Sequence, residues 1–493
     1  MNYVSTRNKN VKISSADAII KGLSEDGGLF VPQTIPAVSE TEISSMINSD
    51  YKTRAKLILS KFLTDYSEDE LESCINGAYT DQKFGGSNPA PVKKLDDNNF
   101  VLELWHGPTC AFKDMALQIM PRLLTTALKK QNSDKTIVIL VATSGDTGKA
   151  ALEGFCDVEG TKILVFYPAH GVSEVQKKQM TSQSGSNTGV MGVLGNFDDC
   201  QSGVKRIFSD EKAVKRLEKG GFVFSSANSI NWGRLVPQVV YYFSAYADLV
   251  KSEDIKTGDK LDFIVPTGNF GDILAGYIAK QMGLPVGKLV CASNKNNVLT
   301  DFIKTGTYNK NRDFFTTMSP SMDILISSNL ERLLFIMSGY DDVKVSGYMD
   351  QLNKTGKYTV DPEILSKIQT DFIAGYADEQ QTLAAIDDAY NRFNYVIDPH
   401  TAVGYCVSAG YQSGNKKVIL STASPYKFPK SVIKGLGGSI QAENEFKLFE
   451  ILNKKTGVEI PPSLASLENA QVRFDGKCSK EDMTEKVYEF LNV

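Results

Sequence analysis

The sequence is poor in the residues from which metal sites are built. Among its 493 residues there are three histidines, at positions 106, 170 and 400, and seven cysteines. The histidines are widely separated and no two cysteines form a C-x-x-C pair, so a zinc site has few ligands available. We therefore expect no metal. The odd number of cysteines argues against a complete disulfide framework, and we expect the thiols to be reduced.

The sequence also lacks a strong charge excess and a long hydrophobic run. It has 54 Lys and Arg against 58 Asp and Glu, without the basic stripe that is typical of nucleic-acid binding. No run of about 18 apolar residues occurs, and the N-terminus, MNYVSTRNKN, lacks the apolar centre of a signal peptide. We expect a cytoplasmic protein with no membrane or nucleic-acid partner, whose ligand is a small molecule.

What the sequence does contain is a regular alternation of apolar runs, rich in β-branched residues, with helical patterns. The predicted strands cover residues 136–143, 162–168, 189–195, 261–266, 288–293 and 416–423. Two of these strands turn directly into helices, through SGDTGKAALEGF and GNFGDILAGY. This alternation predicts right-handed βαβ units and parallel sheets, and therefore an α/β fold.

The length of the chain predicts several packed units, roughly two to four. We divide it into a mostly helical N-terminal region, residues 1–95, a smaller α/β domain, residues 96–235, and a larger α/β domain, residues 236–493. Helical periodicity with few strand signals over about 305–395 predicts a helical insertion in the larger domain.

Two glycine-rich turns, TSGDTGK at 143–149 and PTGNFGD at 266–272, each connect a predicted strand to a predicted helix. Backbone N–H groups at the start of a helix attract anions such as phosphate. Glycines also serve simply to make tight turns, so one such turn alone leaves both interpretations open. Neither turn has the spacing of a Walker A loop or of G-x-G-x-x-G, and nucleotide binding is poorly supported.

The stretch HGPTCAFKDMALQ places a single lysine, Lys113, just after a Gly-Pro turn. Its amine either lies in water beside Asp114 or is buried, in which case desolvation lowers its pKa and frees it to form a Schiff base. One amine and two anion-binding turns match pyridoxal phosphate together with an anionic substrate. Thr422, just past a predicted strand, is a candidate contact for the cofactor's ring nitrogen, although it also suits a strand-end cap.

A series of long motifs extends over nearly the whole chain, in the order YVSTRN, GLSEDGGLFVP, HGPTCAFKDMALQ, ATSGDTGKAA, GNFDDCQ, NSINWGRL, PTGNFGDILAGY, SPSMDILISSNLERLL, DPHTAVGY and STASPYKFP. On these motifs the chain resembles the threonine synthase family in the form found in fungi and many bacteria. The resemblance implies the tryptophan-synthase-β-like fold, in which two parallel-sheet α/β domains close over pyridoxal phosphate, with an additional, mostly helical N-terminal region.

The resemblance also implies roles for individual residues. Lys113 is the Schiff-base lysine, and Thr422 contacts the ring nitrogen. The residues implied to bind the cofactor phosphate are Gly268, Asn269, Phe270, Gly271 and Asp272. Asp146 stands where related folds often have an asparagine facing the ring hydroxyl. The residues implied to bind substrate are Ser144, Gly145, Thr147 and Gly148, and Asn228, Ser229, Asn231 and Arg234.

One motif departs from the family pattern. Many members read TAHPAKF where this chain reads TASPYKF, so Ser424 replaces a histidine and Tyr426 replaces an alanine. We assign no role to position 424. His106 and His400 lie inside family motifs, and we interpret both as structural residues because a histidine is more often hydrogen-bonded than catalytic.

The activity that the resemblance implies is that of a carbon–oxygen lyase acting on phosphates: O-phospho-L-homoserine and water are converted to L-threonine and phosphate. Two alternatives remain, a phospho-lyase that gives 2-oxobutyrate and a catalytically silent binding paralogue, and Lys113 and Thr422 argue against the silent one. Monomer and homodimer are both compatible with the sequence. The family pattern begins at Tyr3, without the extension of plant-type members, so we expect no activation by S-adenosylmethionine.

Overall fold

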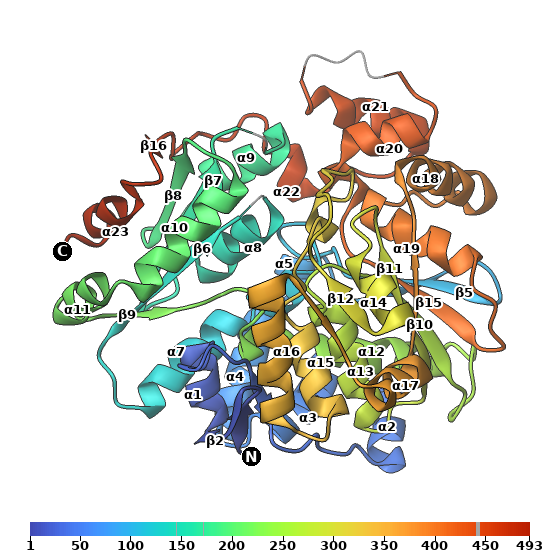
Figure 1. The fold of residues 1–493 in the computed structure, drawn as a ribbon. Coiled ribbons are helices and arrows are strands. Elements are labelled where there is room, and N and C mark those ends of the chain that lie inside the picture. The colour runs from blue at the N-terminus through green and yellow to red at the C-terminus, as the bar shows by residue number, and fades with distance from the viewer. Residues whose placement is uncertain (144, 171, 440–443) are drawn as a thin grey trace.

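The computed structural model describes residues 1–143, 145–170, 172–439 and 444–493, and two largely parallel sheets dominate it (Figure 1). The five-stranded sheet has the order β16-β8-β7-β6-β9, and the six-stranded sheet has the order β14-β11-β10-β15-β5-β4. All neighbouring strands in both sheets are parallel except β4, which runs antiparallel to β5. The prediction of an α/β fold with parallel sheets is confirmed.

The N-terminal region combines helices with a small antiparallel sheet that the sequence pattern did not predict. The sheet contains β1 (Tyr3–Ser5), β2 (Asn8–Ile13) and β3 (Phe30–Pro32). The helices are α1 (Ser15–Lys21), α2 (Glu40–Met46), α3 (Tyr51–Phe62), α4 (Glu68–Ala78) and α5 (Asp81–Phe84). Serines and acidic residues form capping boxes at the starts of α1, α2 and α4, which explains where these helices begin.

The five-stranded sheet is built around β6 and β7, whose residues are nearly all buried because helices cover both faces. Its strands are β6 (Thr136–Ala142), β7 (Thr161–Pro168), β8 (Thr188–Val193), β9 (Phe222–Ser225) and β16 (Lys477–Cys478). The helices between residues 114 and 219 are α6 (Asp114–Leu117), α7 (Met120–Lys130), α8 (Asp146–Phe155), α9 (Glu174–Thr181), α10 (Phe197–Ser209) and α11 (Glu211–Lys219). The C-terminal helix α23 (Met483–Leu491) packs against α10.

The six-stranded sheet forms the second layer of the molecule. Its strands are β4 (Val92–Lys94), β5 (Asn99–Glu103), β10 (Leu261–Pro266), β11 (Val286–Ser293), β14 (Phe372–Tyr376) and β15 (Lys416–Ser421). Its helices include α12 (Trp232–Lys251), α13 (Gly271–Gln281), α14 (Val298–Thr305) and α19 (Pro399–Ala409). The apolar cores of the two layers meet at α12, which is buried along almost its whole length.

Further elements surround the second sheet. A two-stranded ribbon contains β12 (Thr307–Asn309) and β13 (Lys357–Thr359). The remaining helices are η1 (Pro320–Met322), α15 (Leu330–Met337), α16 (Asp342–Thr355), α17 (Pro362–Asp371), α18 (Glu379–Phe393), η2 (Pro425–Lys427), α20 (Pro429–Gly435), α21 (Lys447–Thr456) and α22 (Pro462–Ala465). The predicted helical insertion therefore contains helices, but it also contains β14, an edge strand of the sheet.

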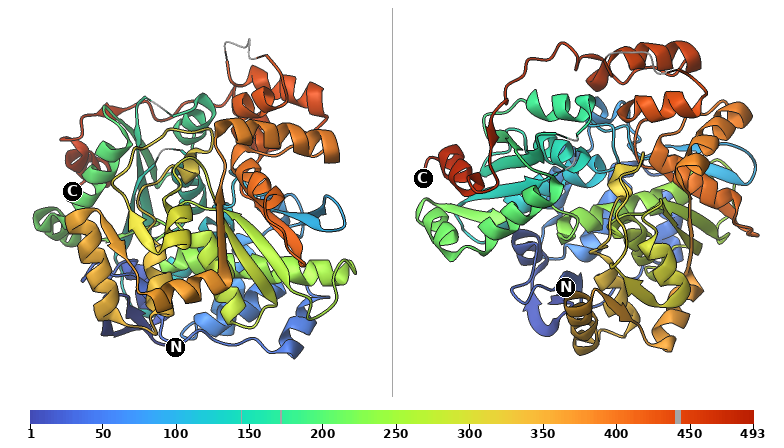
Figure 2. Two further views of the ribbon diagram at one scale, coloured as in Figure 1. Left: turned by 45° about the vertical axis from the view of Figure 1, so that its right-hand side comes forward. Right: turned by 45° about the horizontal axis from the view of Figure 1, so that its top comes forward.

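The sheets do not follow the three predicted ranges throughout. β5 lies in the range 96–235 but pairs with β15 of the second sheet, with Phe100 opposite Val418. β16 lies near the C-terminus but pairs with β8 of the first sheet. Figure 2 shows the chain after α22 running back to the five-stranded sheet, where α23 lies. The division at residues 95 and 235 stays a prediction, and the chain crosses between the sheets more often than it implies.

The described residues contain no helix that combines the length and apolarity needed to span a bilayer. Nor do these same ranges contain a group of three or more His, Cys, Asp or Glu side chains that could hold a metal ion. All seven cysteines lie in described positions and carry free thiols.

Candidate active site

The loop that carries Lys113 lies against the end of strand β15. The Phe112 N–H donates to the Thr422 carbonyl oxygen at 2.8 Å, and Ala111 forms a bridge with Ala423. Ligands of open α/β sheets bind beyond the carboxyl ends of such strands. Two residues that the sequence analysis placed in one site, Lys113 and Thr422, are thus held together by the backbone.

Lys113 is buried, with 9% of its surface exposed, so the interpretation of a solvated surface lysine is wrong. Its Nζ lies 3.4 Å from the Ser321 hydroxyl and 3.8 Å from Oδ2 of Asp146. Burial lowers the pKa of Lys113, and the positive charges of Arg234 and Lys427 act in the same direction, while Asp146 opposes them. A lysine with this environment is suited to nucleophilic and proton-transfer chemistry.

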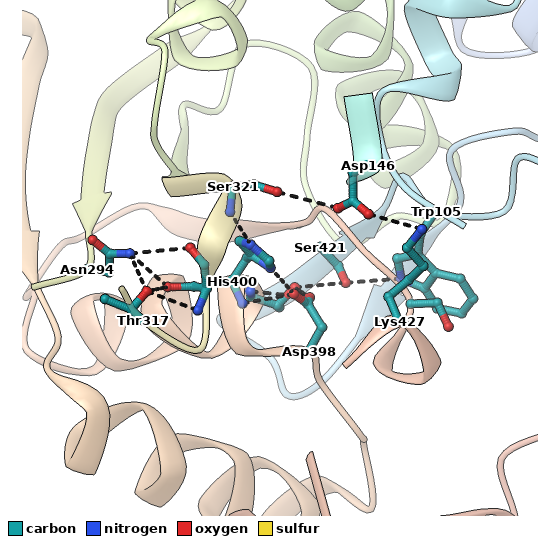
Figure 3. A network of polar contacts seen from close by, with 12 residues as sticks. Trp105, Asp146, Asn294, Thr317, Ser321, Asp398, His400, Ser421 and Lys427 are labelled. Carbon is teal, nitrogen blue, oxygen red and sulfur yellow. Dashed lines mark hydrogen bonds and ion pairs between the residues drawn. The ribbon is translucent and has the colours of Figure 1, made fainter. Parts of the chain in front are cut away.

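Asp146, the first residue of α8, lies between two buried lysines, Lys113 and Lys427, and Figure 3 shows its contact with Lys427. Its Oδ1 accepts from Lys427 Nζ at 3.0 Å and from the Gln176 amide at 3.0 Å, and its Oδ2 points to Lys113. Burial alone would raise the pKa of Asp146, but the charges of Lys427 and Lys113 and the Gln176 hydrogen bond hold it well below its usual range. Asp146 therefore remains ionised.

The site holds more buried positive than negative charge. Lys113, Lys427 and Arg234 are each at most 9% exposed. Burial lowers the pKa of Arg234 to about 10, and its Nε has no partner in the described part of the chain. Burial raises the pKa of the neighbouring Asp114 to about 7, which leaves Asp146 as the fully ionised carboxylate. Three cations beside one such carboxylate favour an anionic ligand.

The turn between β6 and α8 has a backbone that requires glycine. Gly145 has φ +149°, and a Cβ at Gly148 would lie 2.3 Å from Cγ2 of Thr143. The Thr143 hydroxyl accepts from the N–H groups of Gly145 and Gly148, both at 3.0 Å. Thr143 thus occupies two of the donors that an anion would use. Thr147 is half-buried in the first turn of α8, and Ser144 lies outside the described residues.

The segment 319–329 packs against the turn between β10 and α13. The Ser327 hydroxyl donates to the Gly268 carbonyl at 2.8 Å, and the backbone and side-chain nitrogens of Asn329 both donate to the Asn269 carbonyl at 3.1 Å. Phe270 adopts the left-handed conformation, φ +61°, as the N-cap of α13. Ser327 and Asn329 thus bind the carbonyls of Gly268 and Asn269. Gly271 begins α13, and the N-terminus of a helix favours phosphate.

Asp272 is the member of this turn whose side chain does not suit a phosphate. Its Oδ1 accepts from the hydroxyls of Tyr241, at 2.5 Å, and Tyr242, at 2.9 Å. Burial raises the pKa of Asp272 to about 6. The carboxyl is held by the tyrosines of α12, so the contribution of Asp272 to anion binding is limited to its backbone N–H.

The residues of the motif NSINWGR have different roles in the structure. Asn231 caps α12: its Oδ1 accepts from the Gly233 N–H at 2.8 Å, and its amide donates to the carbonyls of Ile19 and Ser226. These bonds occupy the side chain that the sequence analysis assigned to substrate. The Ser229 carbonyl accepts from Asn329, and Asn228 is half-buried. Of the four predicted residues, Arg234 is the one whose charge reaches Lys113.

The two departures from the family motif have structural roles. The Ser424 hydroxyl caps η2 by accepting from the Tyr426 N–H at 3.3 Å. The Tyr426 hydroxyl donates to the Val458 carbonyl at 2.5 Å, and its ring packs edge-on against Phe449. Neither side chain contacts Lys113 in the described structure.

Four residues of the site were not predicted: Ser321, Ser327, Asn329 and Lys427. The first three lie in SPSMDILISSN, a motif that carried the resemblance but received no role. A signal was present, since this polar run has no helical or strand period and its serines and asparagine suit backbone-binding turns. Lys427 lies in STASPYKFP, another motif that carried the resemblance, but it received no role because a lysine is usually solvated and only the fold buries this one.

These residues fit a group that carries both an aldehyde and a phosphate, as pyridoxal phosphate does. A buried amine of lowered pKa suits the aldehyde, and the glycine turn at the start of α13 suits the phosphate. A Cβ at Gly268 would lie 2.7 Å from the Ser321 carbonyl oxygen, so the turn needs glycine to lie this close to the segment beside Lys113.

Three family profiles match successive parts of the chain. They are described as threonine synthase N terminus, over residues 2–79, pyridoxal-phosphate dependent enzyme, over 88–422, and threonine synthase C-terminal, over 401–486. The second alone covers more than half of the chain, and the prediction of pyridoxal phosphate is confirmed at the level of this family.

Individual relatives agree with the profiles. Human threonine synthase-like 1 is 43% identical over 432 residues, which are 85% of this chain and 58% of that protein, so the chain spans little more than half of its length. Threonine synthase of Pseudomonas aeruginosa is 38% identical, with 89% of this chain and 91% of that protein covered. The crystal structure of pyridoxal-phosphate-bound threonine synthase from Brucella melitensis is 37% identical, with a TM-score of 0.89 and both chains covered completely. The chain therefore belongs to the threonine synthase family of pyridoxal-phosphate-dependent enzymes.

Proposed function

We propose that this protein is a threonine synthase, a lyase that converts O-phospho-L-homoserine and water to L-threonine and phosphate. The observation that carries the proposal is the buried amine of Lys113 beside two further buried cations, Lys427 and Arg234. The substrate has a carboxylate and a phosphate, and this excess of buried positive charge suits both. A cytoplasmic location and action on this small molecule are parts of the same proposal.

Each segment of the site has a distinct part in holding the cofactor. Lys113 would hold its aldehyde, and the N–H groups at the start of α13, after Gly268 and Asn269, would hold its phosphate. Thr422 lies just past the end of β15 and would contact the ring nitrogen, and ionised Asp146 would face the ring hydroxyl. When bound, pyridoxal phosphate supplies an electron sink for negative charge that develops on substrate carbon.

Lys113 also moves protons in the proposed reaction. Burial lowers the pKa of Lys113, so its neutral amine forms more readily than that of a solvated lysine. A neutral Nζ can take a proton from the substrate carbon and return it to a neighbouring carbon. Asp146, kept ionised by Lys427, stabilises the protonated form of Lys113 between these two steps.

Arg234 and the turn before α8 bind the anionic groups of the substrate. The guanidinium has an unpartnered Nε within the described residues, and its fork suits a carboxylate or a phosphate. The Thr147 hydroxyl and the N–H groups of Asp146 and Thr147, which Thr143 does not bind, provide further donors. Donors that are fixed before the reaction stabilise the leaving phosphate without reorganisation, often the largest contribution to catalysis.

The test is to supply O-phospho-L-homoserine to the purified protein and to identify the products. Threonine and phosphate in equal amounts would support the proposal. Formation of 2-oxobutyrate and ammonia would replace it with a phospho-lyase, and no product would favour a silent paralogue. Lys113→Ala is the control for activity, because alanine offers no amine, and Lys113→Arg is a second, because a guanidinium stays protonated.

A further inference from the structure

A chain of polar contacts leads from the start of α19 through His400 and Ser321 to the amine of Lys113, and Figure 3 shows the part of it from Asp398 to Asp146. Asp398, the N-cap of α19, lies 2.8 Å from Nδ1 of His400. Nε2 of His400 lies 3.2 Å from the backbone nitrogen of Ser321 in η1. The Ser321 hydroxyl in turn lies 3.4 Å from Nζ of Lys113. Three segments distant in sequence thus meet at the reacting amine.

The contacts of His400 define one tautomer. The backbone N–H of Ser321 can only donate, so Nε2 of His400 accepts and carries no proton. The proton of the neutral ring is then on Nδ1 and is donated to Asp398. Asp398 is itself fixed by the backbone N–H of His400 at 2.8 Å and by the Thr401 hydroxyl. Asp398 and His400 are at most 3% exposed, so this geometry is shielded from water.

The contacts of Ser321 define the direction of its hydroxyl. Oγ lies 3.4 Å from Oδ2 of Asp146 and 3.4 Å from Nζ of Lys113. The Asp146 carboxylate is ionised and only accepts, so the hydroxyl proton goes to Asp146 and an oxygen lone pair faces Lys113. The Ser321 carbonyl packs against Gly268, which places the residue between the phosphate-binding turn and the lysine.

We propose that Ser321 is a further catalytic residue, whose hydroxyl binds the amine of Lys113, and that Asp398 and His400 are the positioning pair that holds it there. The inference rests on the proposed function, because it concerns the lysine that would react. While Lys113 takes and returns a proton, one of its N–H bonds is held by Ser321. The remaining lone pair or proton of Nζ is then directed to the substrate carbon.

The first test compares Ser321→Ala with Ser319→Ala. Both remove a hydroxyl from the same segment, but the Ser319 hydroxyl faces Asn294 and not Lys113. Ser321→Ala should lower kcat about ten- to a hundred-fold, the effect of one lost hydrogen bond to a charged group, with KM for O-phospho-L-homoserine little changed. Ser319→Ala should leave kcat within about two-fold. Equal losses in both variants would show general disruption of the segment and would overturn the proposal.

A second measurement needs no substrate. Apoprotein is mixed with pyridoxal phosphate, and the recovery of visible absorbance reports the capture of the aldehyde by Lys113. Ser321→Ala should slow this capture several-fold, because the amine is no longer oriented, whereas Ser319→Ala should not. An unchanged capture rate together with an unchanged kcat would refute the role of Ser321. If the wild-type protein makes no threonine, the proposed function fails, and the capture rate still tests Ser321.

The positioning pair is tested at His400. In His400→Gln the side-chain oxygen can still accept from the Ser321 N–H, whereas in His400→Leu it cannot. We expect His400→Leu to reproduce the loss of kcat seen in Ser321→Ala, and His400→Gln to recover most of it. Equal impairment of both variants, at equal thermal stability, would contradict the positioning role. This comparison remains available if Ser321→Ala does not fold.

Discussion

The glycine at position 268 gives the sharpest prediction about the cofactor site. A Cβ built on Gly268 would lie 2.7 Å from the Ser321 carbonyl oxygen and 3.3 Å from Cα of Met322. Both neighbours are backbone atoms, so the overlap cannot be relieved by turning a side chain. We therefore expect Gly268→Ala to separate the turn at 266–272, which we propose binds the cofactor phosphate, from the η1 segment.

The expected loss of cofactor affinity follows from the free-energy cost of overpacking a tight contact, about 1–3 kcal/mol. The apoprotein can relieve the overlap by letting η1 move, whereas the loaded site needs the turn and η1 in place together. The cost should therefore fall on cofactor binding, which would weaken roughly 5- to 150-fold at about 1.4 kcal/mol for each factor of ten. The η1 shift would also carry the Ser321 hydroxyl away from Lys113.

The assay uses Gly271→Ala as a matched control in the same turn. There the nearest atom to an added Cβ is Nδ2 of Asn329, at 3.4 Å, an ordinary contact. Both variants would be dialysed, and their visible absorbance and their dissociation constants for pyridoxal phosphate would be compared. Gly268→Ala should lose cofactor and Gly271→Ala should keep it. Retention by Gly268→Ala, or loss from both alike, would refute the reasoning from this contact.

Three further predictions concern stability and substrate. Burial raises the pKa of Asp114 in the folded protein from 3.8 to about 7, so the folded state binds this proton more tightly than the unfolded state. The free energy of unfolding should therefore fall as pH rises from about 4 to 7, by roughly 4 kcal/mol at most, and urea unfolding of Asp114→Asn should lack this part of the slope. Arg332, fully buried, donates to the Phe30 carbonyl at 2.8 Å and also contacts Ile230 and Asn329. Arg332→Lys should lower the free energy of unfolding by roughly 2–4 kcal/mol, and an unchanged urea midpoint would contradict this. Thr147→Val should keep the cofactor absorbance but raise KM or lower kcat about ten-fold, and loss of cofactor would show that this turn binds the cofactor instead.

The sequence predicted those parts of the fold that depend on local pattern. β6, β7 and β10 are buried apolar runs followed by helices, and their pattern identifies them as strands of parallel sheets. Pairing partners were not predictable in the same way. β16 has only two residues, and its place beside β8 depends on contacts across almost 300 positions, which no local period encodes.

The site shows the same division between local and tertiary information. The turns at 143–149 and 266–272 were found because their glycines lie between a predicted strand and a predicted helix, although the glycines alone did not separate anion binding from a simple tight turn. Ser321 and Lys427 were missed because each is an ordinary polar residue until the fold buries it beside Asp146. Asn231 was assigned to substrate through the family resemblance, and a motif alone does not separate ligand binding from helix capping, its role in the structure.

The central claim is that Lys113 is the residue that binds pyridoxal phosphate. The most direct measurement is to reduce the cofactor-loaded protein with borohydride, digest it and locate the modified peptide by mass spectrometry. We expect the cofactor on Lys113, within the peptide that contains CAFKDMALQ. Attachment to Lys427, the other buried lysine of the site, or to any other lysine would contradict it.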